Sequence, residues 1–399
     1  MAGLILPAAA WRARAGLAEL IAALGDGNAR FVGGAVRDTL LGLDVHDIDV
    51  ATPLRPDDVS ERIARAGFKV VPTGLAHGTV TAVLPSGPVE VTTLRRDVAT
   101  DGRHAVVAFA DDWREDAARR DFTMNALYAD PVSGAVFDYF GGIADLTAGR
   151  IAFIGAPLRR IAEDHLRILR FFRFLARFGD VAAGAGPDPA GLAACVARAN
   201  DLMALSRERI RDELLKLLVA RGAVAVVRLM VGHGILVPVV PEVDADGVER
   251  LARLVEAEAS VGIAPSAVRR LAALLPPAAA ETVGARLKLS KHDRKRLVDA
   301  TGGPGYEGVR GLAYRAGLDG ARDRLLLAGA ALGELSAWQP PRFPLTGGAL
   351  IARGLTPGPE VARSLREVER RWIAAGFPAD ADPIADAVVQ AAGRSASIA

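Results

Sequence analysis

The spacing of apolar and polar residues divides the chain into a mixed first part and a helical remainder. In the first third, short runs with apolar alternation stand between glycine turns, which is typical of half-buried strands. A helical pattern covers Trp11–Leu24 and another covers residues 52–67, whereas Asp97–Glu115 is polar, weakly periodic and predicted to be a mobile excursion. The predicted strands are Ala29–Val32, His46–Val50, Lys69–Pro72, Thr79–Leu84 and Val89–Leu94.

Beyond Arg150 the strand signals fade and a helical period replaces them. The stretch Trp338–Pro359 is rich in proline and glycine. The pattern therefore predicts an α+β chain, with a mixed head followed by an all-helical part. The predicted helices are Arg159–Phe178, Leu192–Leu205, Ser206–Ala220, Val248–Glu258, Ala267–Leu275 and Val361–Ala375.

Composition narrows the classes of protein that remain. Hydrophobic residues make up 51% of the 399, which is enough for a sizeable core, and a net charge of +2 means that any basic surface must be local. The single cysteine, Cys195, excludes an internal disulfide and cysteine-rich zinc sites. No uncharged run has the length of a bilayer span, and no basic residue precedes the apolar start as in a secretory signal. We therefore expect a cytoplasmic protein that does not enter a membrane.

The segment Phe31–Asp38 is predicted to run from a strand through a glycine turn into a helix. Gly33 and Gly34 would let the backbone approach an anion closely. Arg37 falls in the first helical turn, where a cation opposes the helix dipole, so an anion such as a triphosphate would explain its position. On its own, this segment fits an ordinary strand, turn and helix equally well.

Two carboxylates follow at strand spacing. Residues two apart on a strand point to the same side, so Asp47 and Asp49 would face one spot, at a cost unless a cation lies between them. Oxygen ligands of this kind suit Mg²⁺, and phosphoryl transfer with metal ions needs carboxylates of this type beside a triphosphate site. Glu90 is the best candidate for a third carboxylate on a neighbouring strand, and a solvent-facing strand residue is its alternative.

Together with Arg119–Leu127, these segments resemble the bacterial CCA-adding enzymes and poly(A) polymerases, the class II tRNA nucleotidyltransferases. The resemblance is dense from about residue 32 to 215. The sequence departs from the family pattern at Gly347–Leu350, because relatives often carry an acidic residue after the glycine. The role of the tail therefore stays open. Further matching motifs are Asp138–Gly142, Glu163–Arg167 and Ser206–Leu214.

The resemblance implies a polymerase-β-type nucleotidyltransferase head over residues 1–150, a helical neck over 151–220 that selects the nucleotide and binds RNA, and a tRNA-binding body and tail over 221–399. It implies Mg²⁺ on Asp47 and Asp49. The implied activity is addition of C, C and A to the 3′ end of tRNA from CTP and ATP, without a template and with release of diphosphate. The implied nucleotide contacts, beside Gly33 from the glycine turn, are Gly34, Arg37, Arg120, Asp164, Arg167, Arg170 and Arg173.

The pair Asp164 and Arg167 has the chemistry to read a base. A carboxylate accepts from the exocyclic amino group of cytosine or adenine, and a guanidinium donates to their ring or carbonyl acceptors. Uracil and guanine would instead present a carbonyl oxygen to the carboxylate and a ring N–H to the guanidinium, so that acceptor faces acceptor and donor faces donor. Asp164 and the arginines lie three residues apart on the predicted helix Arg159–Phe178, so Arg167, Arg170 and Arg173 share a face of it, for which a solvated basic surface is the alternative.

Other activities remain open within and beyond this class. A poly(A) polymerase or a partial enzyme adding only CC or only A is the nearest alternative, although Val71–Val80 lacks the basic segment typical of the polymerases. An inactive RNA-binding relative is a third, against which Arg37, Asp47 and Asp49 argue. Near the C-terminal end, Arg363, Arg366, Arg370 and Arg371 could extend an RNA-binding stripe or belong to a solvated mixed-charge helix. Oligomeric state does not follow from the sequence.

Overall fold

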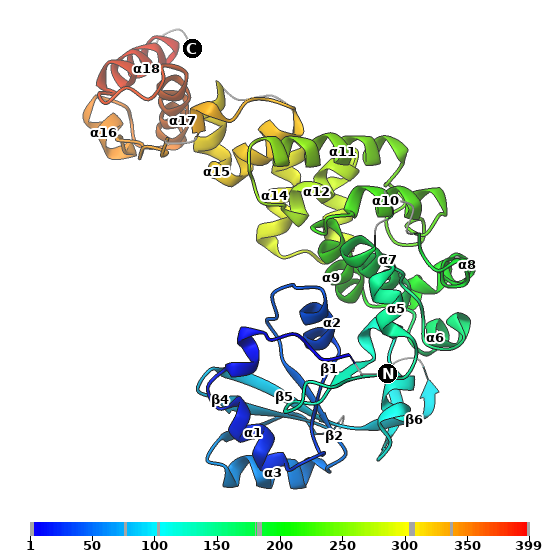
Figure 1. The fold of residues 1–399 in the computed structure, drawn as a ribbon. Coiled ribbons are helices and arrows are strands. Elements are labelled where there is room, and N and C mark those ends of the chain that lie inside the picture. The colour runs from blue at the N-terminus through cyan, green and yellow to red at the C-terminus, as the bar shows by residue number, and fades with distance from the viewer. Residues whose placement is uncertain are drawn as a thin grey trace. The chain divides into compact units, whose positions relative to one another are not determined.

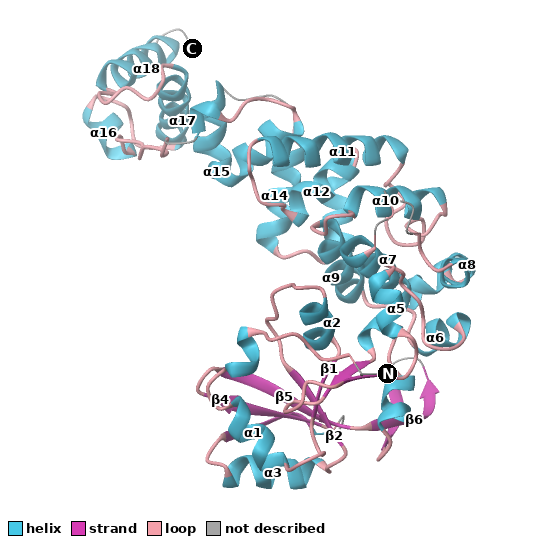
Figure 2. Cartoon of the chain, in the orientation of Figure 1, coloured by secondary structure: helices cyan, strands magenta, loops and turns pink. Residues whose placement is uncertain are grey.

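The computed structural model describes residues 4–75, 78–101, 104–179, 181, 186–302, 308–335 and 338–396. Two residues of the segment Val71–Val80, Ala76 and His77, lie outside these ranges. The chain forms two compact units, Met1–Pro241 and Glu242–Ala399, which are described separately (Figures 1 and 2).

A seven-stranded mixed sheet forms the framework of the first unit, in the order β3-β4-β5-β2-β1-β8-β9. The central strand β2 runs parallel to β5, and the other neighbours are antiparallel. Alternate residues such as Val80, Ala82 and Val91 are fully buried, as the apolar alternation predicts. The strands are β1 Arg30–Val32, β2 Asp49–Thr52, β3 Lys69–Gly74, β4 Thr79–Leu84, β5 Gly87–Thr93, β8 Leu127–Ala129 and β9 Val136–Asp138.

Helices cover both faces of this sheet, with α1 and α3 on one side and α2 on the other (Figure 1). The predicted helix Trp11–Leu24 is instead two pieces. Gly16 interrupts it with a φ of 86°, a conformation that favours glycine. The helices around the sheet are η1 Ala10–Ala13, α1 Leu17–Leu24, α2 Gly34–Leu40, α3 Pro56–Arg65, α4 Trp113–Ala118, η3 Thr123–Asn125 and α5 Gly142–Thr147.

The predicted irregular excursion at Asp97–Glu115 is wrong in its secondary structure. Strands β6 (Arg95–Asp101) and β7 (His104–Phe109) pair into a separate two-stranded antiparallel sheet, and α4 follows. Backbone pairing in such a hairpin needs no apolar alternation, and the register shifts between Asp97 and Ala99. The sequence therefore shows no period there.

The rest of the first unit is helical and packs on α7. The predicted helix Arg159–Phe178 is broken at residues 164–166, so that Asp164 lies between two helices with extended φ and ψ of −152° and 108°. Phe171 and Phe172 on α7 are fully buried, and the Phe171 ring stacks on Phe153 at 5.5 Å between centroids. These helices are α6 Pro157–Glu163, α7 Arg167–Phe178, α8 Pro189–Ala197, η4 Ala199–Ala204, α9 Arg207–Leu218 and α10 Ala223–Gly232.

Helices are the only regular secondary structure in the described residues of the second unit. Its interior holds buried ion pairs from Arg269 to Glu258 and Asp323. The proline- and glycine-rich stretch Trp338–Pro359 contains the short helix α16. Across the described ranges, no helix has both the length and the apolar character needed to cross a bilayer. The helices are α11 Ala245–Ser260, α12 Ala267–Leu274, η5 Pro277–Ala279, α13 Ala280–Arg286, α14 Lys291–Thr301, α15 Gly308–Leu327, η6 Gly333–Leu335, α16 Gly347–Ala352, α17 Pro359–Ala374 and α18 Asp382–Ala396.

Candidate active site

A cavity of about 530 Å³ in the first unit brings together most of the site residues that the sequence singles out. Seven arginines and four carboxylates line it, an excess of three positive charges in a chain whose net charge is +2. The cavity is therefore a local basic surface, to which a polyphosphate would be attracted. The predicted residues on its wall are Gly33, Gly34, Arg37, Asp49, Glu90, Arg120, Asp164, Arg167 and Arg170.

Asp49 and Glu90 stand side by side on the cavity wall. They are register partners on the parallel strands β2 and β5. Burial, the charge of Glu90 and the charge of Asp47 raise the pKa of Asp49, while Arg120 acts in the opposite direction. The predicted strand His46–Val50 in fact begins at Asp49, so Asp47 precedes the strand, is exposed and does not line the cavity.

The described residues contain no group of three histidine, cysteine or acidic side chains already arranged to hold a metal ion. The donor chemistry at Asp49 and Glu90 nevertheless fits a hard divalent cation, because adjacent carboxylate oxygens are its preferred ligands. Burial is the main cause of the raised pKa of Asp49 and the charge of Glu90 adds to it, and a cation between the two carboxylates would offset both effects.

Asp116 on α4 holds two of the cavity arginines in place, and the sequence analysis missed it. Its carboxylate accepts from Arg119 Nε at 2.8 Å, from Arg120 Nη2 at 3.1 Å and from the Tyr128 hydroxyl at 2.6 Å. Burial acts to raise the pKa of Asp116, but Arg120, Arg119 and the hydroxyl outweigh it and hold the pKa far below its ordinary value. The three- and four-residue spacing to the arginines was the available signal.

Arg37 is buried beside the glycine turn. Its Nε donates to Asp38 Oδ1 at 2.7 Å, its Nη1 donates to Asn125 Oδ1 at 2.5 Å, and the Phe178 ring lies 4.3 Å from its Cζ. Burial lowers its pKa, and Asp38 partly compensates. Gly33, which immediately precedes α2, has a φ of 68°, as the glycine turn requires. The turn and Arg37 thus form one rigid corner of the cavity.

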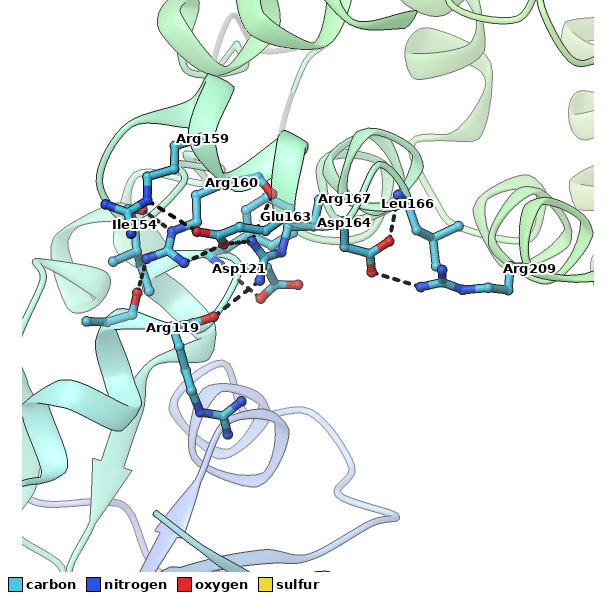
Figure 3. Close-up of polar contacts among 12 residues, drawn as sticks. Arg119, Asp121, Ile154, Arg159, Arg160, Glu163, Asp164, Leu166, Arg167 and Arg209 are labelled. Carbon is cyan, nitrogen blue, oxygen red and sulfur yellow. Dashed lines mark hydrogen bonds and ion pairs between the residues drawn. The ribbon is translucent and has the colours of Figure 1, made fainter. Parts of the chain in front are cut away.

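The base-reading candidates Asp164 and Arg167 are each held by other partners (Figure 3). Asp164 accepts from the Leu166 backbone N–H at 3.1 Å and from Arg209 Nη2 at 2.8 Å. Arg167 Nη1 donates to Glu163 Oε2 at 2.6 Å, and its Nη2 donates to the Arg119 carbonyl at 3.2 Å. Both side chains are therefore fixed before any base arrives.

The arginines of α7 pair with carboxylates from different elements. Arg170 Nε donates to Asp121 Oδ2 at 2.8 Å, and Arg173 Nε donates to Glu213 Oε2 at 2.5 Å. Arg177 lies 3.3 Å from Asp38 Oδ2. Arg170 lines the cavity but Arg173 does not. The basic face predicted for this helix is therefore a set of ion pairs.

The mixed sheet, the carboxylate pair and the basic cavity define a nucleotidyltransferase with a polymerase-β-type head. Residues 29–152 match the family described as "Poly A polymerase head domain", and residues 187–246 match "Probable RNA and SrmB- binding site of polymerase A". The chain belongs to the family of CCA tRNA nucleotidyltransferases and poly(A) polymerases. Nucleotidyltransferases of this family generally use divalent metal ions.

Its relatives and structural neighbours carry matching names. The human protein "CCA tRNA nucleotidyltransferase 1, mitochondrial" is 34% identical over 375 residues, which cover 89% of this chain and 85% of the human one. A "CCA-adding enzyme" of Levilactobacillus brevis is 40% identical over a segment that covers 49% of this chain and 47% of that enzyme. The crystal structure of the Bacillus stearothermophilus CCA-adding enzyme in complex with CTP is 27% identical and superposes with a TM-score of 0.76, over 95% of this chain and 97% of that one.

Proposed function

We propose that this protein adds C, C and A to the 3′ end of tRNA, with CTP and ATP as substrates and release of diphosphate. The observation that carries the proposal is the single cavity that joins the carboxylate pair Asp49 and Glu90 to the base-reading candidates Asp164 and Arg167. The names of the human and bacterial relatives support the choice of tRNA and of CCA.

In this proposal the head holds the triphosphate and the reacting atoms. Arg120, fixed by Asp116, and Arg37 beside the glycine turn face the phosphates, and Asp47, Asp49 and Glu90 hold Mg²⁺. Bound Mg²⁺ would neutralise phosphate charge and favour the ionised nucleophile. The RNA 3′ hydroxyl loses its proton to water as its oxygen attacks the α-phosphorus, the new O–P bond forms as the bond to the β-phosphate breaks, and diphosphate leaves.

The neck selects the base. Asp164 accepts from the amino group of cytosine or adenine, and Arg167 donates to their acceptors. Uracil and guanine present a carbonyl oxygen to the carboxylate and an N–H to the guanidinium, which leaves buried polar groups unpaired at about 1–3 kcal/mol each. No template strand is needed for this discrimination.

The division into a head at 1–150, a neck at 151–220 and a tRNA-binding body and tail at 221–399 is part of the proposal. Some of the arginines suggested as a C-terminal RNA-binding stripe are paired within α17, since Glu367 accepts from both Arg370 and Arg371. That pairing favours the mixed-charge interpretation of this helix. Cytoplasmic location stays a prediction, and the human relative's name includes the word mitochondrial.

Nucleotide addition to defined tRNA ends tests the proposal. Transcripts that end before, within and after CCA are incubated with purified protein, Mg²⁺ and one nucleotide at a time. We expect C to be added to a transcript that ends before CCA and to one that ends in its first C. A should be added only to a transcript that ends in CC, and nothing should be added to one that ends in CCA. Long A tails on an unstructured RNA would instead establish a poly(A) polymerase, and addition of only CC or only A would establish a partial enzyme.

A further inference from the structure

Asp164 has a partner from a distant part of the sequence. Arg209 lies on α9, and its Nη2 donates to Asp164 Oδ2 at 2.8 Å across 45 residues of sequence. Both side chains line the cavity, and both are about one-third exposed, at 30% and 32%. Figure 3 shows the Arg209 guanidinium approaching this carboxylate from the side opposite α6.

The position of Asp164 explains why a partner is needed. The residue lies between α6 and α7 with extended backbone angles, so no regular helix restricts its side chain. The Leu166 backbone N–H holds Oδ1 at 3.1 Å and Arg209 holds Oδ2, and these two donors together fix the rotation of the carboxylate. Each carboxylate oxygen has a second lone pair, so both can still accept from a base.

A second ion pair holds α9, the helix that carries Arg209. Glu213 stands one turn further along α9, on the same face, and accepts from Arg173 of α7 at 2.5 Å. Ile210 and Leu214 anchor the same helix in the core. The helix α9 is therefore held against α7 by its core residues and by an ion pair, which sets the place from which Arg209 reaches Asp164.

We propose that Arg209 is a positioning residue for base selection, which orients the Asp164 carboxylate to accept the exocyclic amino group of cytosine or adenine. The inference rests on the proposed function. Without the guanidinium, Asp164 keeps its charge but loses its fixed direction. The right bases are then bound less well, whereas the wrong bases, which gain nothing from that direction, are affected little.

Steady-state kinetics on a tRNA transcript ending before CCA test this inference. The kcat/KM for CTP and UTP is measured on that transcript, and for ATP and GTP on one ending in CC. We expect Arg209→Gln to lower the C-over-U and A-over-G preferences about tenfold, which is about 1.4 kcal/mol, through CTP and ATP. Lys216→Gln, an exposed charge loss on the same helix, is the control and should leave all four values unchanged.

A double-mutant cycle shows whether the effect passes through Asp164. In an Asp164→Ala background, Arg209→Gln should change the preferences no further, because the carboxylate that it orients is absent. Arg209→Lys, which keeps the charge but not the planar fork, should retain part of the preference. If Arg209→Gln does not fold, the lysine variant is measured in the same cycle and decides.

Two results would overturn the inference while leaving the proposed function intact. One is an Arg209→Gln enzyme with the wild-type preferences, and the other is an equal fall in rate for all four nucleotides. A wild-type protein that adds neither C nor A to tRNA would instead remove the proposed function itself.

Discussion

Replacing Asp49 with asparagine should raise the stability of the metal-free protein while removing its activity. Asp49 and Glu90 are register partners on strands that lie about 4.8 Å apart. Two like charges at roughly this separation repel by about 3 kcal/mol at an effective dielectric constant of about 20. Solvent around the exposed Glu90 screens part of this repulsion and Arg120 offsets more of it, so we expect the substitution to release about 1–2 kcal/mol.

The sign follows from the pKa. The pKa of Asp49 is raised above its ordinary 3.8, so the folded state holds the proton more tightly than the unfolded chain. The wild type therefore loses stability as the pH rises from 3.8 through the folded pKa, and asparagine removes that loss. At neutral pH, about 1–2 kcal/mol corresponds to roughly 2–8 °C in Tm for a unit of this size.

Thermal unfolding with EDTA and then with Mg²⁺ measures both halves of this prediction. Without metal, Asp49→Asn should melt above the wild type. With Mg²⁺, the wild type should gain stability and the variant should gain little, because a ligand that binds the folded state raises the Tm. Turnover should fall at least about 1000-fold, the equivalent of about 4 kcal/mol. A variant that melts below the wild type in EDTA would refute the repulsion argument.

Three other predictions address the base, the arginine support and the RNA. Arg167→Ala should lower incorporation of C and A and relax rejection of U and G, and an unchanged preference among the four nucleotides would show that Arg167 takes no part in reading. Asp116→Asn should cost about 3 kcal/mol at neutral pH, as removal of one partner of a buried ion pair does. Because the folded pKa of Asp116 is lowered, denaturant titrations should show this difference at pH values above 3.8 and a smaller one as the pH falls further. Affinity for tRNA should drop about tenfold or more between 50 and 200 mM salt. It should exceed the affinity for unstructured RNA of equal length and vary little among tRNAs. Equal binding of tRNA and unstructured RNA would contradict a tRNA-specific surface.

Elements with a strong local pattern are the ones that the sequence predicts well. Strand β4 has the predicted bounds of Thr79–Leu84, and the comparisons confirm the α+β class with a nucleotidyltransferase head. The pairing of Asp49 with Glu90 agrees with their expected neighbouring strands, because strand period and order suffice to bring them together. Their role in catalysis stays a prediction.

Features that depend on distant contacts were not predictable. The helical period runs unbroken through residues 164–166, yet the Asp164 carboxylate binds the Leu166 N–H and competes with the helix there. Arg209 is visible in the sequence only as one of several arginines in its helix, since its partner is 45 residues away. The short strands β8 and β9 span three residues each, too few to show a period.

The ion pairs of α7 determine where this protein can be divided. Its arginines connect to Glu163 on α6, Asp121 before η3, Glu213 on α9 and Asp38 on α2. A head truncated near residue 150 would lose the α7 arginines that pair with Asp38 and Asp121 and expose the apolar surface that α7 covers. Chimeras that exchange catalytic heads between family members should therefore be joined after Pro241, where the first compact unit ends. The nucleotide-selecting helices are then exchanged together with the head.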